Sequence, residues 1–319
     1  MTVAWVLGSG GLLGAALCRA LRRSHAELFL PAARICWNDT HKFDAQIAAV
    51  VDAFSSQVGA EDRWEIYWAA GIGTMSSSEE SLAQETRHLA AVLRRVESTP
   101  RLMAASGAVV FASSAGAIYA GSAGGIITED TAPTPTTAYA REKLKQEELV
   151  CSFALANGRM RALIARISTL YGPGQAAGKQ QGLLAHIARS ILRNQPVQIF
   201  VPYDTMRDYI AADDAGPAMV ATLAAMQGEP RVLIKIIASE RPVTIAEIIA
   251  DFRRVSGRAP RVVTSTTRLS ALYARRVQFQ SIVFPGSGRT SARSLLVGID
   301  QLMTSERAAF ARGPHWIAR

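Results

Sequence analysis

The sequence predicts an α/β protein with a doubly wound parallel β-sheet and a smaller C-terminal lobe. Two observations support this fold class. Short apolar runs alternate with helical patterns through the first half of the chain, as in successive βαβ units. A glycine-rich turn also joins the first expected strand to the first expected helix. We expect the sheet domain to comprise residues 1–170 with returning segments at about 205–240, and the lobe to comprise 171–204 and 241–319.

The expected elements follow from hydrophobic periodicity. Apolar runs predict strands, and an apolar stripe such as Leu13, Leu17 and Leu21 predicts a helix. In the first half the strands are residues 2–7, 27–30, 64–68, 108–112 and 161–167, and the helices are 12–23, 43–54, 81–97 and 137–156. The second half gives a helix at 183–193, a strand at 196–201, an extended segment at 206–210 leading into a helix from about 213, a strand at 232–237 and a helix at 244–255. Beyond that the periodicity is weak.

The composition is that of a globular protein, with 319 residues, 49% of them hydrophobic and 19% charged. Three cysteines lack any paired or metal-ligand spacing, so no disulfide framework and no metal site is expected. The N-terminus shows no secretory signal, and no apolar run approaches the roughly 18 residues that span a bilayer. We therefore expect a cytoplasmic protein that does not associate with membranes.

The formal net charge is +9, and arginines account for much of the excess in the last third of the chain. They are interpreted either as a solvated basic surface or as ligands of a diphosphate. Nucleic-acid binding is the weakest interpretation, because aromatic residues do not interleave with the basic ones.

The turn after the first strand has the composition of a phosphate-binding loop. Gly8, Gly11 and Gly14 are spaced three apart, with Ser9 and Leu12 between them. Glycine allows a tight turn and a close approach of the backbone to phosphate, and the free N–H groups of the next helix bind the anion. This arrangement predicts a dinucleotide cofactor.

The end of the second strand bears on which dinucleotide binds. An acid there would hold the ribose 2′-hydroxyl of NAD, but this segment has none. Arg34 is suited to the 2′-phosphate of NADP, or it is a solvated loop residue, and Asp39 and Asp44 are alternative contacts on the adenosine side. NAD and NADP both stay open, with NADP slightly favoured.

The catalytic candidates are Tyr139 and Lys143, which share one face of the helix at 137–156. A neighbouring ammonium and a positive nicotinamide favour the phenolate, so Tyr139 is expected to act as the base. Ser113 and Ser114 end the strand before this helix, where the carboxyl ends of parallel strands bind ligands. Ser114 is preferred over Ser113 because Ala115 and Gly116 allow a close approach.

The order of these motifs resembles that of the extended short-chain dehydrogenase/reductases, the NAD-dependent epimerase/dehydratase group. The residues that carry the resemblance are Gly8, Gly11, Gly14, Ala69-Ala70-Gly71, Ser113-Ser114 with Ile118-Tyr119, Tyr139, Lys143, Arg166 with Tyr171-Gly172-Pro173, Arg207-Asp208-Tyr209-Ile210 and Asp213-Asp214. The resemblance implies a Rossmann-like sheet, a substrate-binding C-terminal lobe, cofactor contacts from Ala69, Ala70 and Gly71, and a homodimer formed through the helices at 81–97 and 137–156. Two positions depart from the family, since Trp68 and Thr169 stand where asparagine is usual.

The resemblance also implies a nucleotide-sugar substrate. Ala115 and Gly116 follow Ser114 in place of the acidic pair of the 4,6-dehydratases, and no cysteine lies near Ser114 as in the fucose-synthase-like enzymes. The remaining set suits C4 epimerisation, and reduction of a keto-sugar or another carbonyl substrate is the alternative. A non-catalytic dinucleotide sensor is a further alternative. By the same resemblance Thr169 lies at the substrate, Arg207 binds the diphosphate, and Arg289 or Arg293 is its second ligand.

Overall fold

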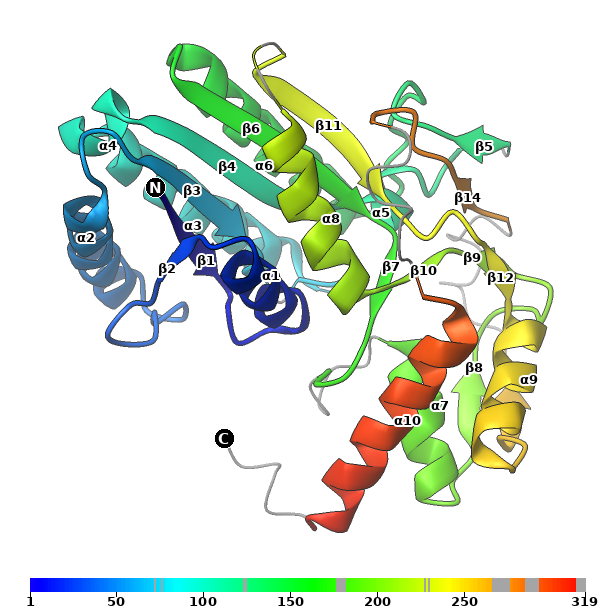
Figure 1. The fold of residues 1–319 in the computed structure, drawn as a ribbon. Helices are drawn as coiled ribbons and strands as arrows, with labels where there is room; N and C mark the ends of the chain where they lie inside the picture. The colour runs from blue at the N-terminus through cyan, green and yellow to red at the C-terminus, as the bar shows by residue number, and fades with distance from the viewer. Residues whose placement is uncertain are drawn as a thin grey trace.

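The computed structural model describes residues 1–71, 73–75, 77–122, 125–175, 182–226, 228, 230–265, 276–284 and 293–313. Its centre is a six-stranded sheet in which each neighbouring pair is parallel (Figure 1). In sheet order the strands are β11 (Val232–Ile237), β6 (Met160–Ile167), β4 (Ser106–Ser114), β3 (Arg63–Trp68), β1 (Thr2–Leu7) and β2 (Glu27–Phe29). The strand order reverses at β1, so the crevice beyond the ends of β1 and β3 is the expected ligand position. The predicted fold class is confirmed.

Helices cover both faces of the sheet. The helices are α1 (Leu12–Arg23), α2 (Thr40–Gln57), α3 (Glu79–Glu97), α4 (Pro100–Ala104), α5 (Ala115–Ile118), α6 (Ala138–Ala156), α7 (Leu183–Leu192), α8 (Ala212–Ala225), α9 (Ile245–Ser256) and α10 (Leu295–Ala311). Among the described residues, no helix has the length and apolarity needed to cross a membrane.

The alternation of side chains along β1 shows how the two layers form. Val3, Trp5 and Leu7 join the core beneath α2, α3 and α6, whereas Ala4 and Val6 join the core beneath α1 and α8. A strand that is buried on both faces has a continuous apolar sequence, as β1 does. On the second face α8 packs closely on α1 because Gly216 has no side chain: a Cβ there would lie 3.0 Å from the carbonyl carbon of Ala16.

The later part of the chain forms a third core away from the sheet. Its buried side chains come mainly from α7, α9, α10 and β8 (Val197–Ile199), and β8 pairs with β13 (Val262–Thr264). Figure 1 shows this group of helices beside the carboxyl-terminal part of the sheet. The other short strands are β5 (Ile126–Ile127), β7 (Thr169–Tyr171), β9 (Met206–Arg207), β10 (Tyr209–Ala211), β12 (Val243–Thr244) and β14 (Gln278–Phe279).

Candidate active site

The glycine turn closes tightly against the loop that follows β3. The Gly11 amide donates to the Gly8 carbonyl over 2.9 Å, and Gly8 has a φ of +84°. A Cβ at Gly8 would lie 2.6 Å from the Ala69 oxygen, and one at Gly14 would lie 2.0 Å from the Gly8 oxygen. Glycine is therefore required at both positions for steric reasons.

The beginning of α1 suits an anion. Gly11 is the N-cap and supplies no side-chain cap, and the first turn of the helix contains no acid. Ser9, Gly10 and Gly11 are exposed, Leu12 is half-buried, and no atom lies within 4 Å of a Cβ built at Gly10. Uncapped N–H groups and the positive end of the helix dipole favour a phosphate here. These residues fit the diphosphate of a dinucleotide.

The other residues expected to contact the cofactor lie on two loops, one after β3 and one after β2. Ala69 and Ala70 follow β3 and lie against Gly8, at the point where the strand order reverses. Gly71 has a φ of +144° and lies beside the Glu85 carboxylate of α3. Arg34 is exposed on the loop between β2 and α2.

Tyr139 and Ser114 come together at the carboxyl edge of the sheet. Ser114 ends β4, and Tyr139 lies in the first turn of α6, where the two side chains interact. The pKa of Tyr139 is raised to about 12, chiefly by burial and also by the Glu85 charge, while the interaction with Ser114 lowers it. The pKa is thus raised, whereas the sequence predicted that the neighbouring ammonium and a positive nicotinamide would lower it.

Lys143 explains part of that difference. Its side chain is buried, and Nζ donates to Gln146 Oε1 over 3.0 Å and lies 4.9 Å from the centroid of the Phe111 ring. Nζ is 5.9 Å from the centroid of the Tyr139 ring. Burial lowers the pKa of Lys143, and the charges of Glu85 and Glu147 oppose this. Tyr139 and Lys143 therefore share one face of the helix, but the ammonium is held by Gln146.

Ser113 belongs to a separate buried network. Its hydroxyl donates to Glu147 Oε1 over 2.5 Å, and Glu147 forms an ion pair with Arg166. Arg166 Nη1 in turn donates to the Tyr119 hydroxyl over 2.6 Å. Neighbouring residues of a strand point to opposite faces, so Ser113 and Ser114 cannot both face Tyr139.

Thr169 and Arg207 line one small cavity beside α5 and β14. Gly116, Ala120, Asp208, Val277 and Phe279 complete its lining. Thr169 begins β7, and its amide donates to the Asp208 carbonyl over 3.0 Å. Asp208 is buried and accepts from Ser168 and Ser239, which fixes the backbone next to Arg207. The two predicted substrate residues are thus brought together.

Two arginines are the candidates for a second diphosphate ligand. Arg289 lies outside the described residues. Arg293 forms an ion pair with Asp214 in the first turn of α8, with Nη2 2.9 Å from Oδ1, and also donates to Gln301. Its guanidinium joins α8 to α10.

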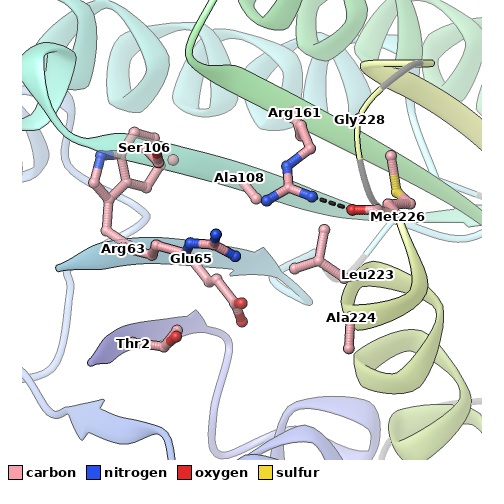
Figure 2. A pocket seen from close by; sticks show the side chains of 12 residues that line it. Thr2, Arg63, Glu65, Ser106, Ala108, Arg161, Leu223, Ala224, Met226 and Gly228 are labelled. Atoms are coloured by element: carbon pink, nitrogen blue, oxygen red, sulfur yellow. Dashed lines mark hydrogen bonds between the residues drawn. The ribbon is translucent and has the colours of Figure 1, made fainter. Parts of the chain in front are cut away.

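The structure also contains a cavity of about 530 Å³ at the opposite edge of the sheet. It lies among the amino ends of the strands and the end of α8, with Thr2, Arg63, Glu65 and Arg161 in its wall (Figure 2). The glycine turn and Tyr139 lie at the carboxyl edge, so this cavity is separate from the candidate site.

Sequence reasoning did not identify Glu85 and Gln146. No local motif distinguishes either residue. Gln146 lies one turn after Lys143 on α6, whereas only the packing of α3 against α6 brings Glu85 near Tyr139 and Lys143.

The sequence matches a known protein family. The family model described as the NAD dependent epimerase/dehydratase family matches residues 4–234. A dTDP-L-rhamnose 4-epimerase from Burkholderia thailandensis is 33% identical over 95 residues, which is 30% of this chain and 26% of that protein. The chain therefore aligns with about a quarter of the length of that curated relative.

Solved structures of other proteins match almost the whole chain. The UDP-glucose 4-epimerase of Thermus thermophilus in complex with NAD is 19% identical, with a TM-score of 0.79 over 97% of this chain and 100% of that chain. RMD from Pseudomonas aeruginosa, complexed with NADPH, has the same identity, TM-score and coverage. At these identities the matches establish the fold.

Proposed function

The chain belongs to the NAD-dependent epimerase/dehydratase family, and on this premise we propose that it is an NAD(P)-dependent sugar-nucleotide epimerase acting at C4. The observation that carries the proposal is the placement of Ser114 and Tyr139 side by side at the edge of the sheet that also holds the glycine turn. A relative named as a dTDP-L-rhamnose 4-epimerase and a fold neighbour named as a UDP-glucose 4-epimerase support this choice of reaction.

In the proposed mechanism Tyr139 moves the proton. Its phenolate accepts the proton of the sugar 4-hydroxyl and returns it after the keto-sugar has turned its other face. A bound nicotinamide would supply the acceptor and donor of the C4 hydride. Ser114 donates a hydrogen bond to the reacting oxygen, and Lys143 stabilises the phenolate and holds the cofactor ribose.

The remaining binding roles follow the same model. Gly8, Ser9, Gly11, Leu12 and Gly14 hold the cofactor diphosphate through backbone N–H groups. Thr169 and Arg207 hold the substrate, because they line a common cavity near Tyr139's end of the sheet. Arg207 is the first diphosphate ligand, and Arg289 or Arg293 is the second, for which Arg293 would exchange Asp214 for phosphate.

The cofactor is a nicotinamide dinucleotide, with NADP slightly favoured over NAD because Arg34 is exposed after β2 and no acid ends that strand. We also propose a cytoplasmic homodimer that pairs α3 and α6 of two subunits. Residues 1–170 and about 205–240 would bind the cofactor, and the remaining segments would bind the sugar nucleotide.

A reductase of a keto-sugar is the second candidate, and one observation favours it. The fold neighbour RMD was solved with NADPH, the reduced phosphorylated cofactor. Net oxidation of the cofactor separates the two reactions, because an epimerase returns the hydride that it removes.

The test begins with mass spectrometry of the purified native protein, to identify a bound NAD or NADP. The protein is then incubated with UDP-glucose, UDP-glucuronic acid and dTDP-L-rhamnose. We expect a C4 epimer to accumulate with no net change in nicotinamide absorbance. Stoichiometric oxidation of NADPH by a keto-sugar would show that the protein is a reductase and not an epimerase. Cofactor binding without turnover of any substrate would favour a non-catalytic dinucleotide sensor.

A further inference from the structure

The loop that follows β3 is built around the side chain of Glu85. The Gly73 amide donates to Glu85 Oε1 over 2.6 Å. A Cβ added at Gly71 or at Gly73 would lie 3.1 Å from Glu85 Oε2, and the one at Gly73 would also meet Leu82 at 2.7 Å. The absence of side chains at 71 and 73 therefore lets this loop close over a carboxylate from α3.

The packing of α3 on α6 directs Glu85 to the candidate catalytic residues. The next residue, Thr86, donates to Glu142 over 2.7 Å and accepts from Gln146 over 3.0 Å, and both partners lie on α6. Gln146 is also the residue that holds the Lys143 ammonium. Glu85 thus lies next to the α3 residue that contacts the Lys143–Gln146 turn of α6, with its carboxylate between that contact and the loop after β3.

From this geometry we propose that Glu85 is the counter-charge of the Tyr139–Lys143 pair, a positioning residue that sets which protons the pair carries. The inference rests on the proposed function, since it assigns Tyr139 and Lys143 their acid–base roles. A negative charge beside a phenol and an ammonium favours the protonated form of both. Consistent with this, the Glu85 charge raises the pKa of Tyr139 and of Lys143.

The other groups around the pair do not replace Glu85. Glu147 of α6 also acts on Lys143, but its carboxylate is shared by Arg166 and Ser113. His88 of α3 lies one turn beyond Glu85, and burial lowers its pKa, which keeps it neutral at pH 7. Ser114 of β4 faces Tyr139 and has no charge. The pH response of the pair is thus expected to depend on Glu85.

The decisive variant is Glu85→Gln, because glutamine retains an oxygen for the Gly73 amide and loses the charge. The pKa values of both Tyr139 and Lys143 should fall, so both limbs of the pH profile of kcat/KM should move to lower pH. We expect a displacement of about 1 pH unit, the lower end of the effect of a neighbouring charge. Glu85→Asp should partly restore the original profile.

Glu142→Gln is the matched control. Glu142 carries the same charge at the same helix interface, but it is paired with Lys145 and shifts the pKa of neither Tyr139 nor Lys143. Its pH profile should keep both limbs in place. If the Glu85→Gln variant is less active but both limbs of its pH profile of kcat/KM stay at the wild-type pH, Glu85 has a purely structural role and the inference is overturned.

A second readout does not depend on turnover. The near-ultraviolet phenolate absorbance of Tyr139 is isolated by subtracting the titration of a Tyr139→Phe protein, with and without Glu85→Gln. The Tyr139 phenolate should appear at lower pH when the charge is removed, and an unchanged titration would contradict the proposal. If Tyr139→Phe retains full activity, the proposed function fails instead, and this titration still tests the electrostatic claim.

Discussion

The two neighbouring serines at the end of β4 face opposite sides of the sheet and have different partners. Ser114 interacts with Tyr139, whereas Ser113 points to the other face and donates to Glu147. Glu147 and Arg166 are 5–6% exposed and joined over 2.7 Å, so their ion pair lies within the protein directly beneath the candidate site. The pair holds α6 against β6 and thereby positions the turn of α6 that carries Tyr139 and Lys143.

Replacing Glu147 with glutamine should destabilise the fold. The substitution leaves the Arg166 guanidinium buried without its counter-charge, and breaking a buried pair in this way costs about 3 kcal/mol or more. Urea denaturation followed by circular dichroism measures the loss. Asp52→Asn is the control, because its partner Arg95 and Asp52 itself are 38% and 59% exposed and such a pair contributes at most about 1 kcal/mol. Equal losses for the two variants would contradict this account.

Some of the site was predictable at this scale. The i, i+4 spacing predicted that Tyr139 and Lys143 share one helix face. The small residues after Ser114 favoured it over Ser113, and Ser114 is the serine that interacts with Tyr139. The direction of the Tyr139 pKa was not predictable, because it depends on burial and on Glu85 from another helix. The sequence contains the carboxylate but no sign that α3 brings it to α6.

At the scale of elements, the phosphate turn shows the strictest geometry. Its glycines differ in what surrounds them: a Cβ at Gly14 would lie 2.0 Å from the Gly8 oxygen, while a Cβ at Gly10 would meet nothing within 4 Å. Packing therefore requires glycine at residue 14 and leaves room for a side chain at residue 10.

Gly14→Ala should separate β1 from α1 and abolish cofactor binding, with a loss of unfolding free energy of about 1–3 kcal/mol from overpacking. Gly10→Ala should retain the stability of the wild type, because its methyl group enters open space. Thermal unfolding and titration with NAD and NADP measure both effects. Comparable stability of the two variants would show that the turn has room for a side chain at residue 14.

Elements with clean apolar patterns were predicted with accurate limits. The strands at 2–7 and 232–237 and the helix at 12–23 coincide with β1, β11 and α1. The sequence pattern did not predict α10, because its apolar residues do not form one stripe. Leu296, Val297 and Phe310 are exposed while Ile299 and Leu302 are buried, so only packing against α7 and α9 identifies the inner face.

At the scale of the whole molecule, three contacts hold α10 in place. Gly298 admits the hydroxyl of Tyr171, from which a Cβ would be only 1.9 Å away. Arg293 pairs with Asp214 of α8, and Arg189 of α7 pairs with Glu306 over 2.8 Å. Tyr171 of β7 and Asp214 of α8 thus hold α10 next to the sheet, and the same contacts fix Arg293, which precedes α10.

Gly298→Ala should displace α10 from Tyr171 and lower the unfolding free energy by about 1–3 kcal/mol. Adding Tyr171→Phe removes the hydroxyl that the new methyl group meets, so the double variant should lose less than the sum of the two single losses. A double-mutant cycle by chemical denaturation measures this coupling. Simple additivity would mean that the two residues do not touch.

The central claim is that Tyr139 moves the proton while hydride is exchanged with the cofactor. The direct test is the Tyr139→Phe variant. Its bound NAD or NADP is measured by mass spectrometry, and its C4 epimer formation is measured with the sugar nucleotide that the wild type converts. Tyr203→Phe is the control, because Tyr203 is 44% exposed. The account predicts unchanged cofactor content, wild-type turnover in the control, and a loss of about 100-fold or more in Tyr139→Phe. Turnover by Tyr139→Phe at the wild-type rate would contradict it.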